Sequence, residues 1–516
     1  MVVHHFLQQS AGQTPDKEAV WEKDHWSTYA EIESRSNRIS NYLREKGIRS
    51  GDRVAVLYEN SVDYIVAYYA VLKAGAVTVA LNTDVDAEAL AYLLNDSGAR
   101  AIVANGRYSR SLSAALAKSS GVVHLVVNSD DLSVFEGVDH CDKISLNEVC
   151  SGWDDNRPMV RVIDVDPASI VYTSGSTGKP KGVTLTHLNI VSNTRSITEY
   201  LELTGEDRVM VVLPFHYIYG KSLLNTHFSV GGSIVLDNRF VFPNVVLDTI
   251  EKTGVTGFSG VPSTFMILLN KSTLKQRSFE SLRYVTQAGG AMAPVVQREV
   301  AEVFHPAKLF VMYGATEASA RLSYLHPDKL QEKLGSIGMA IPNVELCVVD
   351  DNGNRLTPGE EGEIAARGSN IMQGYWNAPE ETAQALKHGF YYTGDLGRMD
   401  EDGYLFVVGR KKDIIKVGGE RISAKEIEEK IIEIESVAEV AVIGVDDPIL
   451  GEAIKAIIVL AKGMRPDEEM LRKELRGRLP SIKQPSYYDF RSDLPKNASG
   501  KVMKRVLREE AAQNDI

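Results

Sequence analysis

The sequence has little cysteine, no long apolar run and no excess of positive charge. Its 516 residues include only three cysteines, Cys141, Cys150 and Cys347, too few and too scattered for a disulfide framework or a zinc site. No uninterrupted apolar segment approaches the roughly 18 residues that a membrane span requires. The start, Met1 to Phe6, lacks the basic and apolar regions of a signal peptide. These absences predict a cytoplasmic protein without a membrane span.

The charge balance also excludes a class of partner. A formal net charge of −12 and a pI near 5.5 argue against nucleic-acid binding, which needs a broad basic face. The composition, 44% hydrophobic and 24% charged, is that of a soluble globular protein. The length predicts about three lobes at roughly 100 to 200 residues each. Any anion must therefore be held by a local site.

The most distinctive local feature is the stretch from Val171 to Gly182. Glycines let backbone N–H groups turn toward a ligand, and hydroxyl and ammonium groups add further donors. The loop differs from the common P-loop, because only two residues separate its glycines 175 and 178 and because Pro180 follows the first lysine. We predict an irregular phosphate cradle, then a helix over 187–197 capped by Thr186; a Gly/Ser surface linker is the alternative. The candidate ligands are Thr173, Ser174, Gly175, Ser176, Thr177, Gly178, Lys179 and Lys181.

Hydrophobic periodicity predicts an α/β fold of stacked, mostly parallel sheets flanked by helices. Helical segments such as 61–73 and 87–94 alternate with strand segments such as 54–57 and 77–81. Helices of this length between short buried strands imply a parallel sheet covered on both faces. The alternation resumes over 165–320. Ligands in such sheets lie beyond the carboxyl ends of the strands, so we expect the glycine-rich loops to converge there.

The pattern changes in the last third of the chain. Residues 335–398 contain short β segments separated by turn residues, which indicates a small β-rich, barrel-like subdomain. The polar turn at 400–403 is the predicted boundary between a domain of residues 1–399 and a small α+β domain of residues 400–516. In the second domain, Ser423 with Glu426 predicts a helix start.

Five motifs follow one another along the chain: Thr173 to Gly182, Tyr313 to Glu317, Tyr392 to Asp395, Gly409 to Asp413 and Pro495 to Lys501. In this order they resemble the motifs of the adenylate-forming superfamily of acyl-CoA synthetases, peptide-synthetase adenylation domains and firefly-type luciferases. The resemblance covers essentially the whole chain. It implies that a carboxylate attacks the α-phosphorus of ATP to give an acyl-AMP and pyrophosphate, and that a thiol then displaces AMP to give a thioester. It also implies that the enzyme uses Mg²⁺ and that its C-terminal domain is mobile. The thiol would be CoA or the phosphopantetheine of a carrier protein.

The resemblance assigns the nucleotide-binding residues. It implies that the cradle binds the pyrophosphate. It also implies that Asp395 binds the ribose hydroxyls, because a carboxylate only accepts hydrogen bonds. It implies that Glu317 and Thr316 bind Mg²⁺, since Mg²⁺ prefers oxygen ligands. On residue type alone, a Thr-Glu pair is a helix cap and a Gly-Gly pair a turn. The remaining residues that it places around adenine, ribose and phosphate are Tyr313, Ala288, Gly289, Gly290, Gly314, Arg398 and Arg410.

The same resemblance places the catalytic cation and the moving parts. Lys501 would bridge the acyl carboxylate and the α-phosphate, because a cation there offsets repulsion between two anions. By motif position Asp400 is the hinge, although an Asp in a polar turn is ordinarily a turn residue. Gly418 and Gly419 would leave room for pantetheine. Without the motif, Lys501 would be interpreted as a solvated lysine.

The segment Pro214 to Gly220 resembles the one that lines the acyl pocket. Amino-acid-activating relatives place an Asp where this chain has His216, so an α-amino acid substrate is disfavoured. His216 either gates the approach of carboxylate or thiol or is structural. Lys221 either pairs with a polar or anionic substrate end or extends outward to solvent. The pocket candidates are Tyr217, Lys221, Ser263, Ala288, Gly314 and Ala315.

Several functions remain open at this point. We favour a ligase that makes an acyl-CoA from a fatty or aryl acid. The alternative is an acyl-AMP ligase that loads an acyl carrier protein. A non-catalytic relative would have lost Lys501 or the cradle, and both are present. A luciferase-like oxygenase is a further possibility, although no separate oxygen-activating metal or flavin motif occurs.

Overall fold

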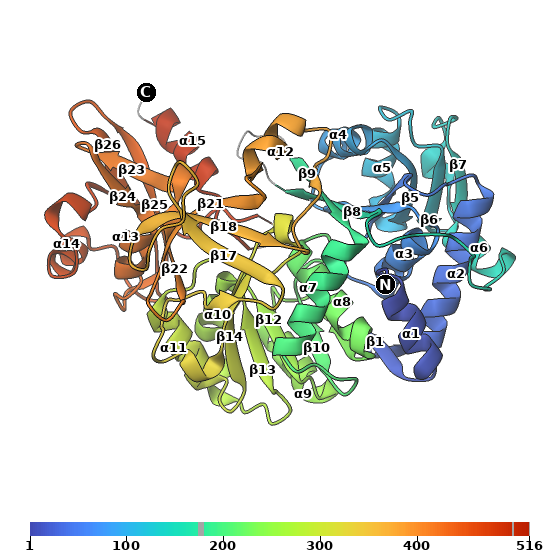
Figure 1. Cartoon of the computed structure of the whole chain (residues 1–516), viewed down its shortest axis with the longest axis horizontal. Helices are drawn as coiled ribbons and strands as arrows, with labels where there is room; N and C mark the ends of the chain where they lie inside the picture. The colour runs from blue at the N-terminus through green and yellow to red at the C-terminus, as the bar shows by residue number, and fades with distance from the viewer. Residues whose placement is uncertain (174–179, 498–499, 515–516) are drawn as a thin grey trace.

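The computed structural model describes residues 1–173, 180–497 and 500–514 (Figure 1). Its central sheet is parallel in the middle and antiparallel at its edges. Its strands run in the order β16 (Met339–Ala340), β15 (Ser323–Leu325), β14 (Lys308–Tyr313), β13 (Tyr284–Gln287), β12 (Gly257–Gly260), β10 (Arg208–Val211), β11 (Ser233–Leu236), β1 (Glu18–Glu22) and β2 (His25–Thr28).

A second sheet lies beside it and is also mostly parallel, with β8 joined to β9 as an antiparallel pair. This pair flanks the predicted cradle, so the cradle connects two neighbouring strands. The strand order is β19 (Gly374–Tyr375), β9 (Lys181–Thr186), β8 (Pro167–Thr173), β4 (Val77–Ala80), β3 (Arg53–Leu57), β5 (Ala99–Asn105), β6 (His124–Asn128) and β7 (Asp142–Ser145).

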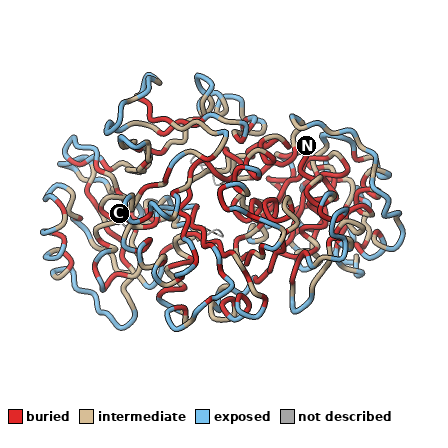
Figure 2. The backbone as a smooth tube through the Cα atoms, turned by 60° about the horizontal axis from the view of Figure 1, so that its bottom comes forward, coloured by how far each residue is buried: buried red, intermediate tan, exposed pale blue. Residues whose placement is uncertain are grey.

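Helices between the two sheets fill the main core, and Figure 2 shows buried residues concentrated there. The clearest case is α3, which is apolar on all sides and therefore suited to burial on all sides; all its residues except Asp63 are buried. The helices packed between the sheets are α1 (His5–Gln13), α2 (Tyr29–Glu45), α3 (Val62–Lys73), α7 (His187–Tyr200) and α8 (Ile218–Val230).

Further helices cover the outer faces, which completes the predicted layered α/β architecture. The outer face of the second sheet packs against α4 (Ala87–Ser97) and α5 (Ser109–Leu116), with α6 (Leu146–Gly152) beside α2. The outer face of the central sheet packs against α9 (Pro243–Thr253), α10 (Pro262–Lys271) and α11 (Pro294–Val303). No helix in the described part of the chain is long and apolar enough to cross a membrane.

Local signals fix several helix starts. Thr28 and Glu31 form a reciprocal capping box at α2, and Thr186 and Asn189 form one at α7. The Thr186 cap predicted from the sequence is therefore confirmed, and α7 extends three residues beyond the predicted end. Each such cap contributes about 1 kcal/mol to helix stability.

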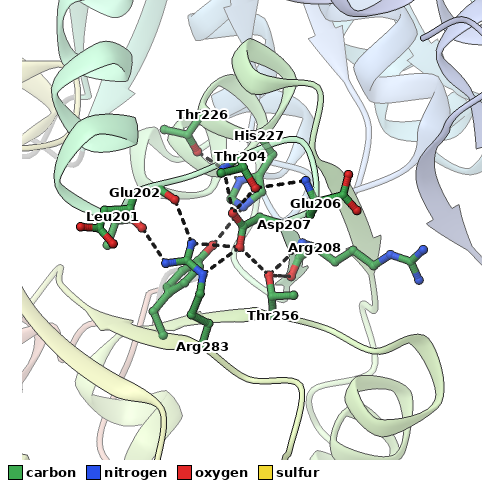
Figure 3. A network of polar contacts seen from close by, with 11 residues as sticks. Leu201, Glu202, Thr204, Glu206, Asp207, Arg208, Thr226, His227, Thr256 and Arg283 are labelled. Carbon is green, nitrogen blue, oxygen red and sulfur yellow. Dashed lines mark hydrogen bonds and ion pairs between the residues drawn. The ribbon is translucent and has the colours of Figure 1, made fainter.

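The amino ends of three central strands are tied together by a buried carboxylate (Figure 3). Asp207 precedes β10, and its side chain accepts hydrogen bonds from the Thr256 hydroxyl at 2.9 Å and from the Arg283 guanidinium at 2.9 Å. Thr256 precedes β12 and Arg283 precedes β13. Burial would raise the pKa of Asp207, but the Thr204 amide and the Arg283 and Thr256 side chains lower it. The network therefore stabilises the edge opposite the carboxyl ends.

The predicted β-rich subdomain is an antiparallel sheet, with β20 (Leu386–Lys387) and the short helix α12 (Pro379–Ala385) beside it. Its strand β21 runs from Phe390 to Met399, because β18 (Glu361–Gly368) and β22 (Leu405–Arg410) pair with it on both sides. Asp395 and Arg398 lie within this strand. The sheet also includes β17 (Val344–Val349). The predicted domain boundary falls in the β21–β22 turn.

The C-terminal unit has its own sheet and core, as an α+β domain should. Its strands run in the order β24 (Glu420–Ser423), β23 (Ile414–Val417), β26 (Gly451–Leu460) and β25 (Val437–Asp447), and β27 (Tyr487–Arg491) pairs with β26. Helices α13 (Ala424–Ile431), α14 (Glu468–Arg476) and α15 (Lys504–Asn514) pack on it. Lys501 lies in the loop before α15.

Candidate functional site

Asp395 is the centre of the candidate nucleotide site. Its carboxylate, which is 7% exposed, lies at the junction of β14 with the β21–β22 pair. The Tyr313 hydroxyl donates to Asp395 Oδ2 at 2.6 Å, and Arg410 Nε lies 2.7 Å from Oδ1. Burial and the nearby carboxylate raise the pKa of Tyr313, which keeps the phenol protonated as a donor. Two partners thus hold the carboxylate in a fixed orientation.

Arg398 does not join this pair. Its side chain is exposed, and its guanidinium carbon lies 5.3 Å from the Phe406 ring centroid. The cation beside Asp395 is instead Arg410, which β22 places opposite Asp395 in the strand register. The role of Arg398 near ribose remains a prediction, whereas the structure does bring together Tyr313, Asp395 and Arg410.

Glu317, the predicted Mg²⁺ ligand, lies in the 3-10 helix η4 (Thr316–Ala318) together with Thr316. The Tyr375 hydroxyl donates to Glu317 Oε1 at 2.8 Å. Burial, followed by the charge of Glu317, raises the pKa of Tyr375. Among the described residues no group of three or more His, Cys, Asp or Glu side chains could hold a metal ion. One carboxylate in such a place fits Mg²⁺, which binds through one or two carboxylates together with substrate phosphates.

Tyr375 also connects Glu317 to the end of the predicted cradle. The ammonium of Lys181 lies 5.4 Å from the Tyr375 ring centroid and 4.0 Å from Glu381. Thr173, at the other side of the cradle, has its hydroxyl 3.5 Å from the Lys181 carbonyl. Thr173 and Lys181 are thus neighbours across β8 and β9. The other predicted cradle residues, 174–179, lie outside the described residues.

Lys501 reaches the nucleotide site from the C-terminal domain. The charge of Arg410 lowers the pKa of Lys501 to about 8; desolvation adds to this effect, while Asp395 opposes it. The ammonium therefore lies close to the Asp395–Arg410 pair. Its backbone N–H donates to Asn497 Oδ1 at 2.9 Å, which shapes the loop.

Gly500 explains how the loop gets close enough. A Cβ at this position would lie 2.5 Å from Ser263 Oγ, and the backbone φ of +80° itself favours glycine. The loop thus packs against the first turn of α10. Beside this contact lies a cavity of about 260 Å³ between the domains, lined by residues that include Ser263, Gly289, Gly290 and Lys501. Gly289 and Gly290 were predicted to lie around adenine, Lys501 was predicted from the last motif, and Ser263 was a candidate for the acid pocket.

The segment after β10 is buried around His216. Its Nε2 atom is buried and has no hydrogen-bond partner among the described residues. Burial, with a smaller contribution from the Lys221 charge, lowers the pKa of His216 to about 4. The imidazole is therefore neutral at pH 7, with its ring 4.7 Å from that of Tyr217. A neutral ring can gate access by its shape but carries no charge toward a substrate.

Lys221 does not extend outward to solvent, so that alternative is wrong. Its side chain is fully buried, with Nζ 3.2 Å from Ser169 Oγ and 5.4 Å from the Tyr68 ring centroid. Burial lowers its pKa to about 7. Ser169 lies on β8, so Lys221 points into the core between the sheets. A lysine that can lose its proton tolerates this environment without a carboxylate.

The small residues near the site have different surroundings. Ala288 is buried at the end of β13, and Ala315 precedes η4. A Cβ at Gly314 would lie 1.8 Å from the Ala320 carbonyl oxygen, so this glycine admits the chain's own backbone. Room for a substrate is therefore not the reason why residue 314 has no side chain.

The predicted hinge and pantetheine residues lie in turns. Asp400 accepts a hydrogen bond from the Tyr404 amide and pairs with Lys333 at 2.8 Å. Partial burial raises the pKa of Asp400, and the bonds from Lys333 and from backbone amides lower it further than burial raises it. Gly418 and Gly419, both at positive φ, form the β23–β24 turn beside Leu450. Their roles remain predictions.

Two residues at the site carry no motif signal. Tyr375 belongs to a two-residue strand that pairs with β9, and Arg321 follows η4 as a buried cation. Neither position can be inferred from local periodicity, because both depend on the return of the chain to the carboxyl ends of the sheets.

The fold and site define a class, the enzymes that bind AMP and form adenylates. The chain matches the family described as AMP-binding enzyme over residues 7–376 and the AMP-binding enzyme C-terminal domain over residues 426–501. It therefore belongs to the AMP-binding enzyme family. The expectation of an AMP-forming acid–thiol ligase of the acyl-CoA synthetase type is confirmed.

Three relatives illustrate the match. A long-chain-fatty-acid–CoA ligase of Bacillus subtilis (strain 168) is 33% identical, with 98% of this chain and 94% of the relative covered. The structure of the anthranilate CoA ligase AuaEII with anthranoyl-AMP has a TM-score of 0.92 at 25% identity, covering 100% of this chain and 98% of that one. The o-succinylbenzoate CoA synthetase of Bacillus subtilis, bound to ATP and a magnesium ion, has a TM-score of 0.82 at 29% identity, covering 98% and 99%.

Proposed function

We propose that this protein activates a fatty or aryl carboxylic acid with ATP, releases pyrophosphate, and transfers the acyl group to CoA. The observation that carries the proposal is the position of Lys501 beside the Asp395–Arg410 pair, with Gly500 packed on Ser263. The C-terminal loop and the N-terminal strands thus contribute to one site. ATP, Mg²⁺ and CoA are the small molecules that such a reaction uses.

In the first step, the chain's own residues orient two anions. Asp395, fixed by Tyr313 and Arg410, accepts hydrogen bonds from the ribose hydroxyls and so positions the α-phosphate. Lys501 places its ammonium between the acid's carboxylate and that phosphate. A preorganised cation at the point where charge develops stabilises the transition state by several kcal/mol.

Glu317 would hold Mg²⁺, which when bound supplies positive charge to the phosphates. The chain's contribution is orientation: Tyr375 donates to Glu317, and the Met372 amide donates to the Glu317 carbonyl at 2.7 Å. Both contacts restrict the carboxylate and its backbone. Such partners of a metal ligand usually contribute 10- to 100-fold to metal affinity.

In the second step, a thiol must reach the acyl-AMP. His216 is neutral at pH 7, which avoids an ion pair with the acid and leaves the ring free to act by its shape. We propose that the C-terminal domain turns about Asp400 and brings the turn at Gly418 and Gly419 toward the site. The positive φ values of both glycines suit a backbone that passes close to a ligand.

CoA is the thiol that we favour, because the relatives are CoA ligases. The phosphopantetheine arm of an acyl carrier protein is the second candidate. The test is pyrophosphate release across aliphatic and aryl acids, followed by thioester analysis with CoA and with holo-carrier protein. Release that depends on acid and a CoA thioester product support the proposal. Absence of release with every acid would contradict it.

A further inference from the structure

Arg321 is a buried cation with no carboxylate partner. It is 2% exposed, and within the described part of the chain no Asp or Glu oxygen lies within ion-pair distance of it. Its Nε donates to Met312 Sδ at 3.3 Å, and Nη1 donates weakly to the Ala320 carbonyl at 3.3 Å. The guanidinium carbon lies 4.0 Å from the Tyr219 ring centroid. The Tyr200 and Tyr219 hydroxyls also form hydrogen bonds with Arg321. All of these neighbours are neutral, and a thioether is a weak acceptor.

The two buried lysines in the described part of the chain avoid an uncompensated charge. The ammonium of Lys73 lies 2.6 Å from Glu33. Lys221, which has no carboxylate, can become neutral, since burial lowers its pKa to about 7. A guanidinium cannot do so, because arginine keeps its proton in proteins. An uncompensated buried charge is costly. Arg321 cannot avoid this cost by losing its proton.

The backbone holds Arg321 firmly in this place. The Arg321 carbonyl accepts hydrogen bonds from the side-chain amides of Asn193 and Asn370, each at 2.9 Å. The two preceding residues have positive φ, 56° at Ser319 and 119° at Ala320. Non-glycine residues in this region cost about 1–3 kcal/mol and persist where the surroundings over-determine them, often at functional sites. The strained turn directs the side chain inward.

The location is the edge of the sheet where a ligand binds. Arg321 follows Glu317 by four residues, and a Cβ on Gly314 would lie 2.9 Å from Arg321 Cα, so Arg321 lies directly behind the carboxyl end of β14. Its ring partner Tyr219 belongs to α8 and anchors its hydroxyl on the Thr286 carbonyl at 3.1 Å, at the neighbouring strand β13. Ligands of such sheets bind beyond these strand ends.

We propose that Arg321 determines acid specificity and that the substrate carries a second carboxylate, which pairs with the guanidinium while the first carboxylate is activated. The inference rests on the proposed function and narrows its substrate class to dicarboxylic acids. A planar guanidinium suits a carboxylate because two parallel N–H groups can donate to its two oxygens. The diacid would supply the missing anion, and Tyr219 would support the guanidinium from its face.

The test compares matched acids by pyrophosphate release: hexanoate with adipate, octanoate with suberate, and benzoate with isophthalate. The wild-type protein should have the higher kcat/KM for the diacid of at least one pair. Arg321→Met should lower kcat/KM for that diacid by about 10²- to 10³-fold, mainly through KM, because it removes one partner of a buried charge pair. It should change the rate with the matched monoacid by less than about threefold.

Arg195→Met is the control, since Arg195 is an exposed arginine of α7, and it should leave the diacid preference unchanged. Arg321→Lys keeps the charge but loses the two parallel N–H groups, so it should give an intermediate loss of kcat/KM for the diacid. It replaces Arg321→Met in the test if Arg321→Met does not fold. A wild-type preference for the monoacid in every pair would overturn the inference while leaving the proposed function supported. Equal losses for both acids in Arg321→Met would also overturn it. No release with any acid would overturn the proposed function and the inference with it.

Discussion

Arg410 Nε lies 2.7 Å from Asp395 Oδ1, across the paired strands β22 and β21. The pair carries no net charge, yet its arginine is close enough to Lys501 to be the main cause of that lysine's low pKa. The ribose site and the catalytic cation are therefore electrostatically coupled. This coupling makes the pH dependence of the first half-reaction a test of the site.

The first prediction concerns that pH dependence. Lys501 acts as a cation, and its pKa is lowered to about 8, so kcat/KM for ATP in adenylate formation should fall as pH rises through about 8. Arg410→Gln removes the positive charge that is the main cause of the low pKa of Lys501, and the charge of Asp395 then raises this pKa. The fall in kcat/KM should therefore move to higher pH. Pyrophosphate release between pH 6.5 and 10 measures it. If kcat/KM fell at the same pH in Arg410→Gln as in the wild type, Lys501 would be excluded as the group whose titration causes the fall.

The second prediction separates the two half-reactions. Lys501→Ala should lower the rate of adenylate formation by about 10²- to 10³-fold, as loss of one preorganised charge stabiliser does. Thioester formation from supplied acyl-AMP should remain close to wild type, because the cation orients only the first step. Stopped assays of each half-reaction measure both rates. If the mutant released pyrophosphate as fast as wild type, the role of Lys501 would be refuted.

The third prediction tests the contact between the domains. Gly500→Val should slow adenylate formation at least tenfold, because its Cβ would lie 2.5 Å from Ser263 Oγ and would hold the Lys501 loop away. Gly463→Val is the matched control. Gly463 has a similar φ of +88° but no atom within 4 Å of its built Cβ, so it carries the same backbone strain of about 1–2 kcal/mol without the clash.

Rates of adenylate formation that fall equally in the two glycine variants would mean that backbone strain, not the contact with Ser263, is responsible. Thioester formation from supplied acyl-AMP should be similar in both, and thermal unfolding should show comparable midpoints.

The fourth prediction concerns Glu317. Tyr375→Phe removes the hydroxyl that donates to Glu317 at 2.8 Å, so the Mg²⁺ concentration for half-maximal adenylate formation should rise about tenfold or more. Tyr487→Phe, at an exposed position, is the control and should not change it. Magnesium titrations at fixed ATP measure the effect. If Tyr375→Phe left the Mg²⁺ concentration for half-maximal adenylate formation unchanged, Tyr375 would have no role in the metal site.

The fifth prediction concerns stability in acid. Burial lowers the pKa of His187 and His227 to about 4 and that of His4 to about 2, so these side chains stay neutral in the folded state. Between about pH 5 and 6.5 the unfolded chain binds protons that the folded chain does not. The free energy of unfolding should therefore fall as pH falls through this window, by up to about 1.4 kcal/mol per pH unit for each histidine.

Urea denaturation between pH 5 and 7 measures this dependence, and calorimetry in buffers of different ionisation enthalpy measures the proton uptake. His227→Asn should reduce the uptake on unfolding by close to one proton at pH 5. A free energy of unfolding that is constant between pH 5 and 7 would contradict the prediction.

Much of the molecule follows from local sequence. The Thr186 and Ser423 caps, the strand at 54–57 and the order of the five motifs can be predicted because caps, periodicity and motif spacing depend on neighbours in the chain. The family resemblance that the motifs carry predicted Lys501, Asp395 and Glu317 as parts of one site, and the structure brings Lys501 and Asp395 together. The motifs thus determined the family and its chemistry.

Tertiary structure alone decided which charged groups meet. Strand register selects Arg410, not Arg398, for Asp395, because the pairing of β21 with β22 sets which side chains face each other. Burial separates Lys221, which can become neutral in the core, from Arg321, which cannot. Neither distinction exists in a linear chain, since both depend on segments that only folding brings into contact and on the water that this contact excludes.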